Sequence, residues 1–217
     1  MRQMMGNLWM EGELVIFFSS PGMGKTVLAV QTADAISKGL SVDLSFLPNE
    51  CEPKRVLLFD FELNDIEFSK RYSTGESAYH FSENFMRTDI NPQFRAKHFG
   101  KRGSVVVMEA IKKEVERVNP DVIIVDNISF LHTESTQDTN IALEVMNYLK
   151  DLKEISGMSI MVIGHTTKVN AGASLNLTHL GGSAHLANFV TSIFAMNKTN
   201  GQFGNRYVKQ LKGRLGR

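Results

Sequence analysis

The sequence has little of what marks a secreted, membrane-spanning or strongly charged protein. A single cysteine, Cys51, among 217 residues excludes an intramolecular disulfide and fits a reducing compartment such as the cytoplasm. The formal net charge of +1 gives no global basic field for nucleic acid. No apolar run approaches the length of a transmembrane helix, and residues 14–18 are too short for a signal-peptide core. We therefore expect a cytoplasmic protein that does not contact a membrane.

The pattern of apolar segments predicts a single α/β domain over residues 1–217. Short apolar runs alternate with amphipathic segments, as in βαβ units around a mainly parallel, twisted sheet flanked by helices. The turn residues 199–201 between the last two runs predict an antiparallel C-terminal hairpin. Residues 73–102 mix glycine, asparagine, proline and charge, and we expect a lid or small insertion there. The expected strands are 14–18, 55–61, 122–125, 159–163, 190–196 and 206–211, and the expected helices are 27–37, 105–118 and 141–155.

A phosphate-binding loop is predicted between the first strand and the first helix. The segment fits the P-loop pattern in its required strand–loop–helix context, although Ser19 replaces the pattern's first glycine. Backbone N–H groups and the helix N-terminus would hold phosphates, Lys25 would reach the β- and γ-phosphates, and the Thr26 hydroxyl would bind Mg²⁺. The sequence thus predicts a site for ATP and Mg²⁺. The loop consists of Ser19, Ser20, Pro21, Gly22, Met23, Gly24, Lys25 and Thr26.

Carboxylates at the ends of two apolar strands are expected beside this loop. Residues 122–126 form an apolar run ending in Asp126, the pattern of a Walker-B carboxylate that acts through Mg²⁺. Asn127 follows, so the base that activates water must come from another strand. The run that ends in Asp60 and Glu62 supplies it, and Glu62 is the better candidate because it lies just past the strand end. The alternative is that Glu62 caps the helix that follows.

A third strand, residues 160–164, runs into His165. This side chain could hydrogen-bond the γ-phosphate or the attacking water and report its loss to the polar loop that follows. A lone histidine at a strand end is more often a satisfied surface residue. Because three other strand ends are expected to converge on one ligand, we favour a sensor role for His165.

The order of these motifs resembles that of the RecA-like ATPases. The phosphate loop, the acid pair, Asp126, His165 and the segment 181–188 are most similar to the hexameric replicative-helicase branch, DnaB-like and plasmid RepA-like, and to related ATPases of mobile elements. The resemblance implies an ATPase motor that forms a homo-oligomer, a hexameric ring, and acts on single-stranded DNA as a helicase or translocase. It also implies that Lys212 and Arg214 enter the ATP site of the neighbouring subunit. Because no amino-terminal primase-interacting domain precedes these motifs in the sequence, we do not expect a DnaB replication helicase as such.

The resemblance leaves the DNA role open. Of the two loops expected to face a ring channel, 132–139 carries two acids and no lysine or arginine, and 166–180 carries one lysine, Lys168. The most basic cluster, residues 95–102, is at least as well explained as a solvated turn. The alternative function is a nucleotide-switched regulatory or partner-binding ATPase that moves no DNA. A small-molecule kinase is disfavoured by the Glu62, His165 and Lys212/Arg214 set.

Lys25 is the one cation that we expect near the phosphate loop from its own chain. The strand 206–211 should lie at an edge of the sheet, far from that loop. Lys212 and Arg214 are two apart, so in an extended segment both side chains point the same way and could reach a neighbour's γ-phosphate. The alternative is that both are ordinary solvated charges on a frayed chain end.

Overall fold

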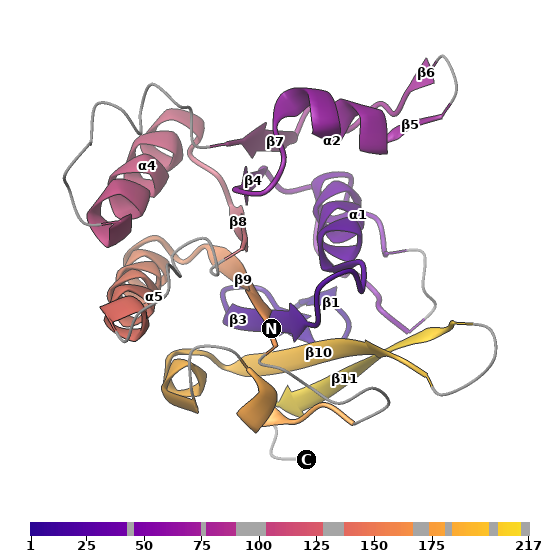
Figure 1. The fold of residues 1–217 in the computed structure, drawn as a ribbon. Coiled ribbons are helices and arrows are strands. Elements are labelled where there is room, and N and C mark those ends of the chain that lie inside the picture. Colours follow the sequence, from indigo (N-terminus) through magenta and orange to yellow (C-terminus); the bar gives the residue numbers. More distant parts are fainter. Residues whose placement is uncertain are drawn as a thin grey trace.

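A seven-stranded sheet forms the centre of the molecule in the computed structural model (Figure 1). Its strand order is β11-β10-β3-β9-β8-β4-β7, and every neighbouring pair is parallel except β10 and β11. This confirms the predicted α/β, RecA-like architecture and its antiparallel C-terminal hairpin. The structure describes residues 1–42, 46–74, 77–89, 103–127, 137–166, 174–180, 184–199 and 204–213.

The elements follow the expected order, with boundaries that differ from the prediction by a few residues. The strands of the main sheet are β3 (Leu14–Ser19), β4 (Val56–Asp60), β7 (Phe85–Thr88), β8 (Val122–Asp126), β9 (Ser159–His165), β10 (Ser192–Lys198) and β11 (Arg206–Lys212). The helices are α1 (Lys25–Ser37), α2 (Asp65–Arg71), α4 (Gly103–Val118) and α5 (Gln137–Ser156), with 3-10 turns η2 (Leu177–His179) and η3 (Ala184–Phe189). The small pairs β1 (Gln3–Met5) with β2 (Trp9–Met10) and β5 (Ser73–Thr74) with β6 (Ser77–Ala78) are antiparallel.

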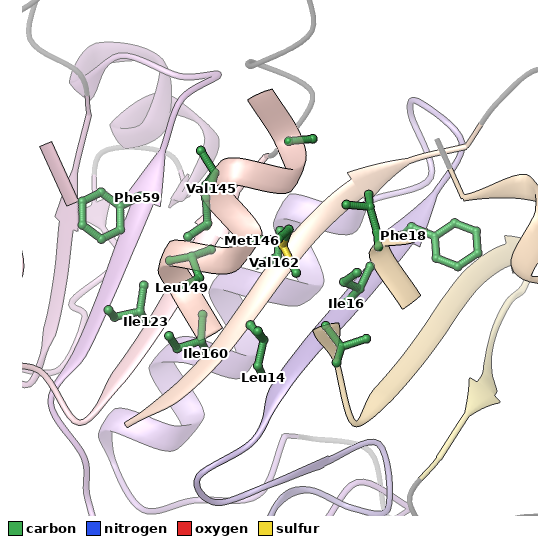
Figure 2. Close-up of a cluster of buried hydrophobic side chains, with 14 of the residues drawn as sticks. Leu14, Ile16, Phe18, Phe59, Ile123, Val145, Met146, Leu149, Ile160 and Val162 are labelled. Carbon is green, nitrogen blue, oxygen red and sulfur yellow. The ribbon is translucent and has the colours of Figure 1, made fainter. Parts of the chain in front are cut away.

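Helices cover both faces of the sheet, which explains why its central strands are apolar throughout. Successive side chains of a strand point to opposite faces, so Leu14, Ile16 and Phe18 of β3 join the core under α4 and α5 (Figure 2). The intervening Val15 and Phe17 join a second core with α1. In Figure 1, α1 and α2 accordingly lie on the opposite side of the sheet from α4 and α5.

The strand register brings the polar strand ends to one edge. Ser19 at the end of β3 is paired with His165 at the end of β9. Asp60 at the end of β4 is likewise paired with Asp126 at the end of β8. The predicted convergence of strand ends is therefore present, because these strands run parallel and stop at the same level.

The segment 73–102, expected to be a lid or small insertion, contributes a strand to the main sheet. β7 pairs in parallel with β4 and forms one edge. It was not predicted because its four residues include Arg87 and Thr88 and show no apolar run. Residues 75–76 and 90–102, with the basic cluster 95–102, lie outside the described part. None of the helices in the described ranges is long and apolar enough to cross a membrane.

Candidate functional site

The phosphate loop joins the buried end of β3 to the start of α1. Gly24 is the N-cap of α1 and has no side chain to satisfy the first N–H groups of the helix. Gly22 and Gly24 have φ angles of 73° and 92°, a conformation that favours glycine. A Cβ built on Gly22 would meet nothing within 4 Å, so the loop surface there is open. Free N–H groups at a helix N-terminus, next to open space, form an anion site of the kind that phosphate requires.

Lys25 is buried inside this loop. Its Nζ donates to the main-chain oxygens of Ser19 and Ser20 at 3.1 and 3.2 Å. The same atom lies 3.1 Å from Nδ1 of His165. Burial lowers the pKa of Lys25, while the carboxylates of Asp126 and Glu62 act in the opposite direction. The acceptors that now hold the ammonium are neutral. A bound phosphate would offer it a charged acceptor instead.

Asp126 is the buried carboxylate of the site. Both of its oxygens lack a hydrogen-bond partner of normal geometry among the residues that the structure describes. Burial raises the pKa of Asp126 to about 7, and the nearby Thr26 hydroxyl partly opposes this shift. An unsatisfied buried carboxylate next to a hydroxyl is a donor set that Mg²⁺ prefers. Thr26 and Asp126 therefore fit the metal-binding roles predicted for them.

Glu62, Asn127 and His165 contact one another on the open side of the loop. The Asn127 amide nitrogen donates to Glu62 Oε1 in a short hydrogen bond and lies 2.9 Å from His165 Nε2. Glu62 Oε1 is 3.4 Å from the same ring nitrogen. His165 therefore lies between the Lys25 ammonium, at Nδ1, and the Glu62–Asn127 pair, at Nε2, and its tautomer sets which ring nitrogen accepts a hydrogen bond. The sequence indicates only that Asn127 is not a base, and it does not predict the contact of Asn127 with Glu62.

A buried ion pair holds the turn that carries Glu62. Asp60 accepts hydrogen bonds from the main-chain N–H groups of Glu62 and Leu63, at 3.0 and 2.9 Å. Its other oxygen receives Nε of Arg87 at 3.0 Å, and the Arg87 guanidinium lies 4.6 Å from the Phe68 ring centroid. Glu62 does not cap α2, so that alternative is wrong. Asn64 is the cap, in a capping box with Glu67.

The far end of β11 holds Lys212 in a structural contact. Its ammonium donates to the main-chain oxygens of Ala187 and Val190 at 2.6 and 2.8 Å. Ile193, near the start of β10, is its partner in the sheet, so Lys212 lies at the edge opposite the phosphate loop. Arg214 lies outside the described residues. The role of both residues in a neighbouring subunit stays a prediction.

Comparison with known proteins identifies the family. The AAA domain family matches residues 1–171. The chain belongs to this family. Membership makes the chain a P-loop ATPase domain, and such domains bind nucleotide, generally with Mg²⁺.

Two relatives show how far the AAA domain resembles other proteins. DNA repair protein RadA of Streptococcus pneumoniae (strain ATCC BAA-255 / R6) is 24% identical over 161 residues, which are 72% of this chain and 31% of RadA. The chain therefore spans about a third of that relative's length. The structure of flagellar accessory protein FlaH from Methanocaldococcus jannaschii superposes with a TM-score of 0.61 at 16% identity, over 94% of this chain and 80% of FlaH. These similarities establish the AAA family and the RecA-like fold, and do not place the domain in the hexameric-helicase branch.

One premise of the shared-site prediction is wrong for this AAA domain. A Cβ built on Gly24 would lie 3.9 Å from Nε and 4.0 Å from Cζ of Arg206. The first residue of β11 therefore lies beside the phosphate loop, and Lys25 is not the only cation there. The expectation failed because β10 pairs directly with β3, which brings the hairpin next to the loop. Of the two loops expected to face a ring channel, 132–139 and 166–180, residues 132–136 and 167–173 lie outside the described residues.

Replacing Arg87 with methionine should destabilise the AAA domain by about 3–5 kcal/mol, because Asp60 would stay buried without its counter-ion. Adding Asp60→Asn to this variant should recover much of the loss, since an amide oxygen can still accept from the turn. Thermal or urea unfolding measures both. The control is Asp65→Asn, which removes the exposed partner of Arg87 and should change stability by less than about 1 kcal/mol. A double variant as unstable as Arg87→Met would contradict the assignment.

Proposed function

We propose that this AAA domain binds and hydrolyses ATP, and that its nucleotide state controls association with a partner, without moving DNA. One observation carries the proposal: polar contacts connect the phosphate loop to the cluster of Glu62, Asn127 and His165 and to the end of β9. Lys25 contacts His165, and His165 contacts Glu62. In parallel, the Ser20 hydroxyl lies 3.0 Å from that of Thr166.

The chemistry of this proposal is divided among residues already placed. Bound Mg²⁺ would neutralise charge on the phosphates, held by Thr26 and Asp126. Lys25 supplies a positive charge directed into the loop. The Glu62 side chain is more than a third exposed, and Asn127 holds its carboxylate by a hydrogen bond. In this proposal Glu62 orients the attacking water molecule and takes a proton from it. His165 lies between Lys25 and Glu62. Its hydrogen bonds therefore depend on whether Lys25 binds a phosphate and whether Glu62 binds the attacking water.

The switch follows from the position of His165 and Thr166 at the end of β9. An anion that draws Lys25 away from His165 changes the hydrogen bonds of His165, which lies two residues before segment 167–173. The main-chain N–H of Thr166 also donates to the Ser19 oxygen at 3.2 Å, so a hydrogen bond joins the phosphate loop to the strand end. ATP and ADP would therefore present different surfaces at this edge.

Several observations support a switch over a DNA motor. The net charge is +1, and the segments expected to face DNA carry Glu134, Asp138 and a single lysine. FlaH, which shares the fold, is named as a flagellar accessory protein. The similarity to RadA, a DNA repair protein, supports the translocase hypothesis instead. Under the translocase hypothesis, the protein would form a homo-oligomeric ring that binds single-stranded DNA.

Two measurements on the same preparation separate these functions. For the switch, ATPase activity should be unchanged by single-stranded DNA, while the mass in solution should differ between ADP and ATP-γ-S. For the translocase, single-stranded DNA should raise turnover and bind more tightly in ATP-γ-S. Phosphorylation of a small acceptor would revive the kinase hypothesis. Absence of any ATP turnover would contradict the proposal as a whole.

A further inference from the structure

We propose that Arg206 is a second cation of the nucleotide site and contacts the polyphosphate bound by its own chain. The inference deepens the proposed ATP binding and rests on it. It assigns a role to a residue at the far end of the chain, 181 positions after Lys25.

The strand register places Arg206 at the end of the sheet where the phosphate loop begins. Met196 of β10 pairs with Ser19, the first residue of the phosphate loop. Arg206 pairs with Lys198, two residues further along β10. Because β11 runs antiparallel to β10, its first residue lies at the end of the sheet that carries the phosphate loop. Its last residue lies at the other end of the strands.

The alternation of side chains along β11 places Arg206 on the correct face. Val208 packs against the core that contains α1. Arg206 is two residues from Val208 and therefore points to the same face, the one on which α1 begins. Lys209 and Leu211 point the other way, and Leu211 packs against the core under α4 and α5.

The distance to Gly24 brings these placements together. The guanidinium lies about one van der Waals contact beyond the position that a Cβ on Gly24 would occupy, at 3.9 Å for Nε. Its side chain makes no hydrogen bond or ion pair with the rest of the chain as far as the structure describes it. Arg206 is exposed, and an exposed guanidinium next to a phosphate loop matches polyphosphate oxygens, which it can bind with two parallel hydrogen bonds.

The competing explanation is that Arg206 protects an edge strand. β11 is an edge of the sheet, and charged residues on such strands hinder pairing with other chains. That role would apply equally to Lys209 on the opposite face. Lys209 is therefore the matched control, since its Nζ contacts Ser174 and not the loop.

Binding of Mg–ATP and of inorganic tripolyphosphate by Arg206→Ala tests the proposal. Both affinities should fall by about tenfold or more, because each loses a charge-assisted hydrogen bond. Arg206→Lys should lose less, and Lys209→Ala should match the wild type. Equal affinity in Arg206→Ala and wild type would overturn the proposal. Weaker ATP binding with unchanged tripolyphosphate binding would overturn it too, because the contact would then be to the base or sugar.

Mixed subunits test whether the contact lies within one chain. A chain carrying Lys25→Ala has a defective loop beside an intact Arg206, and an Arg206→Ala chain has the reverse. If both groups serve the same site, mixing the two should restore no tight binding and no activity. Restoration would show that Arg206 acts on a neighbour, as predicted for Lys212 and Arg214, and would overturn the assignment within one chain. A wild-type protein that binds neither ATP nor tripolyphosphate would instead contradict the proposed function.

Discussion

Replacing Glu62 with glutamine should lower ATP turnover by about 100-fold or more and leave Mg–ATP binding nearly unchanged. Glutamine keeps the size of the side chain and can still accept from Asn127, but it cannot take a proton from water. Steady-state ATPase assays and direct binding of ATP, measured side by side, test this separation of chemistry from affinity.

The exposure of Glu62 makes the result informative. Its side chain is 42% exposed, so the substitution removes a charge without leaving a buried group unsatisfied. Glu83→Gln, at another exposed carboxylate on the turn before β7, is the control and should behave like wild type. Normal turnover in Glu62→Gln would mean that another group activates water. Lost ATP binding would mean that Glu62 has a structural role.

Replacing Lys25 with alanine should reduce ATP turnover by at least about 1,000-fold and also weaken ATP binding. The ammonium is the buried cation that the loop encloses, and no water molecule can supply its charge at that place. Lys113→Ala, at an exposed lysine on α4, should leave both quantities unchanged. Persistent turnover in the Lys25 variant would remove the central assignment.

Unfolding measurements distinguish this effect from misfolding. Lys25 donates to the main-chain oxygens of Ser19 and Ser20, so its loss leaves two oxygens without this donor. The variant should nevertheless unfold cooperatively, because the two cores on either side of the sheet contain no part of the loop's polar contacts. A folded variant that has lost ATP binding and turnover is the expected combination.

The phosphate loop and its helix could be predicted because their signal is local. Gly22, Gly24, Lys25 and Thr26 are close in sequence, and their conformation depends on a strand and a helix on either side. Asp126 and His165 could also be predicted, since each ends an apolar run that can only be a buried strand. Parallel pairing then brings such ends together.

Arg87, Asn127 and Arg206 could not be assigned in the same way. Arg87 meets Asp60 only because β7 pairs with β4, and β7 is too short and too polar to be recognised as a strand. In the sequence, Asn127 only departs from the glutamate that often follows a Walker-B aspartate, and its amide contacts Glu62 because β8 and β4 are neighbours. The position of Arg206 beside the phosphate loop depends on the strand order at this edge, where β10 lies between β3 and β11. Each contact is set by which strands pair, and local sequence patterns do not encode that order.

The buried carboxylate of Asp126 has a consequence for how long the protein survives. A buried carboxylate whose oxygens lack hydrogen-bond partners opposes folding, and a bound cation with its nucleotide would reduce that opposition. Any ligand that binds only the folded chain also adds stability by mass action, about 2.7 kcal/mol at a concentration 100 times its dissociation constant. Proteases that capture opened chains would therefore clear the nucleotide-free domain faster than the loaded one. Abundance in a starved cell would then fall with the ATP supply, even with synthesis unchanged.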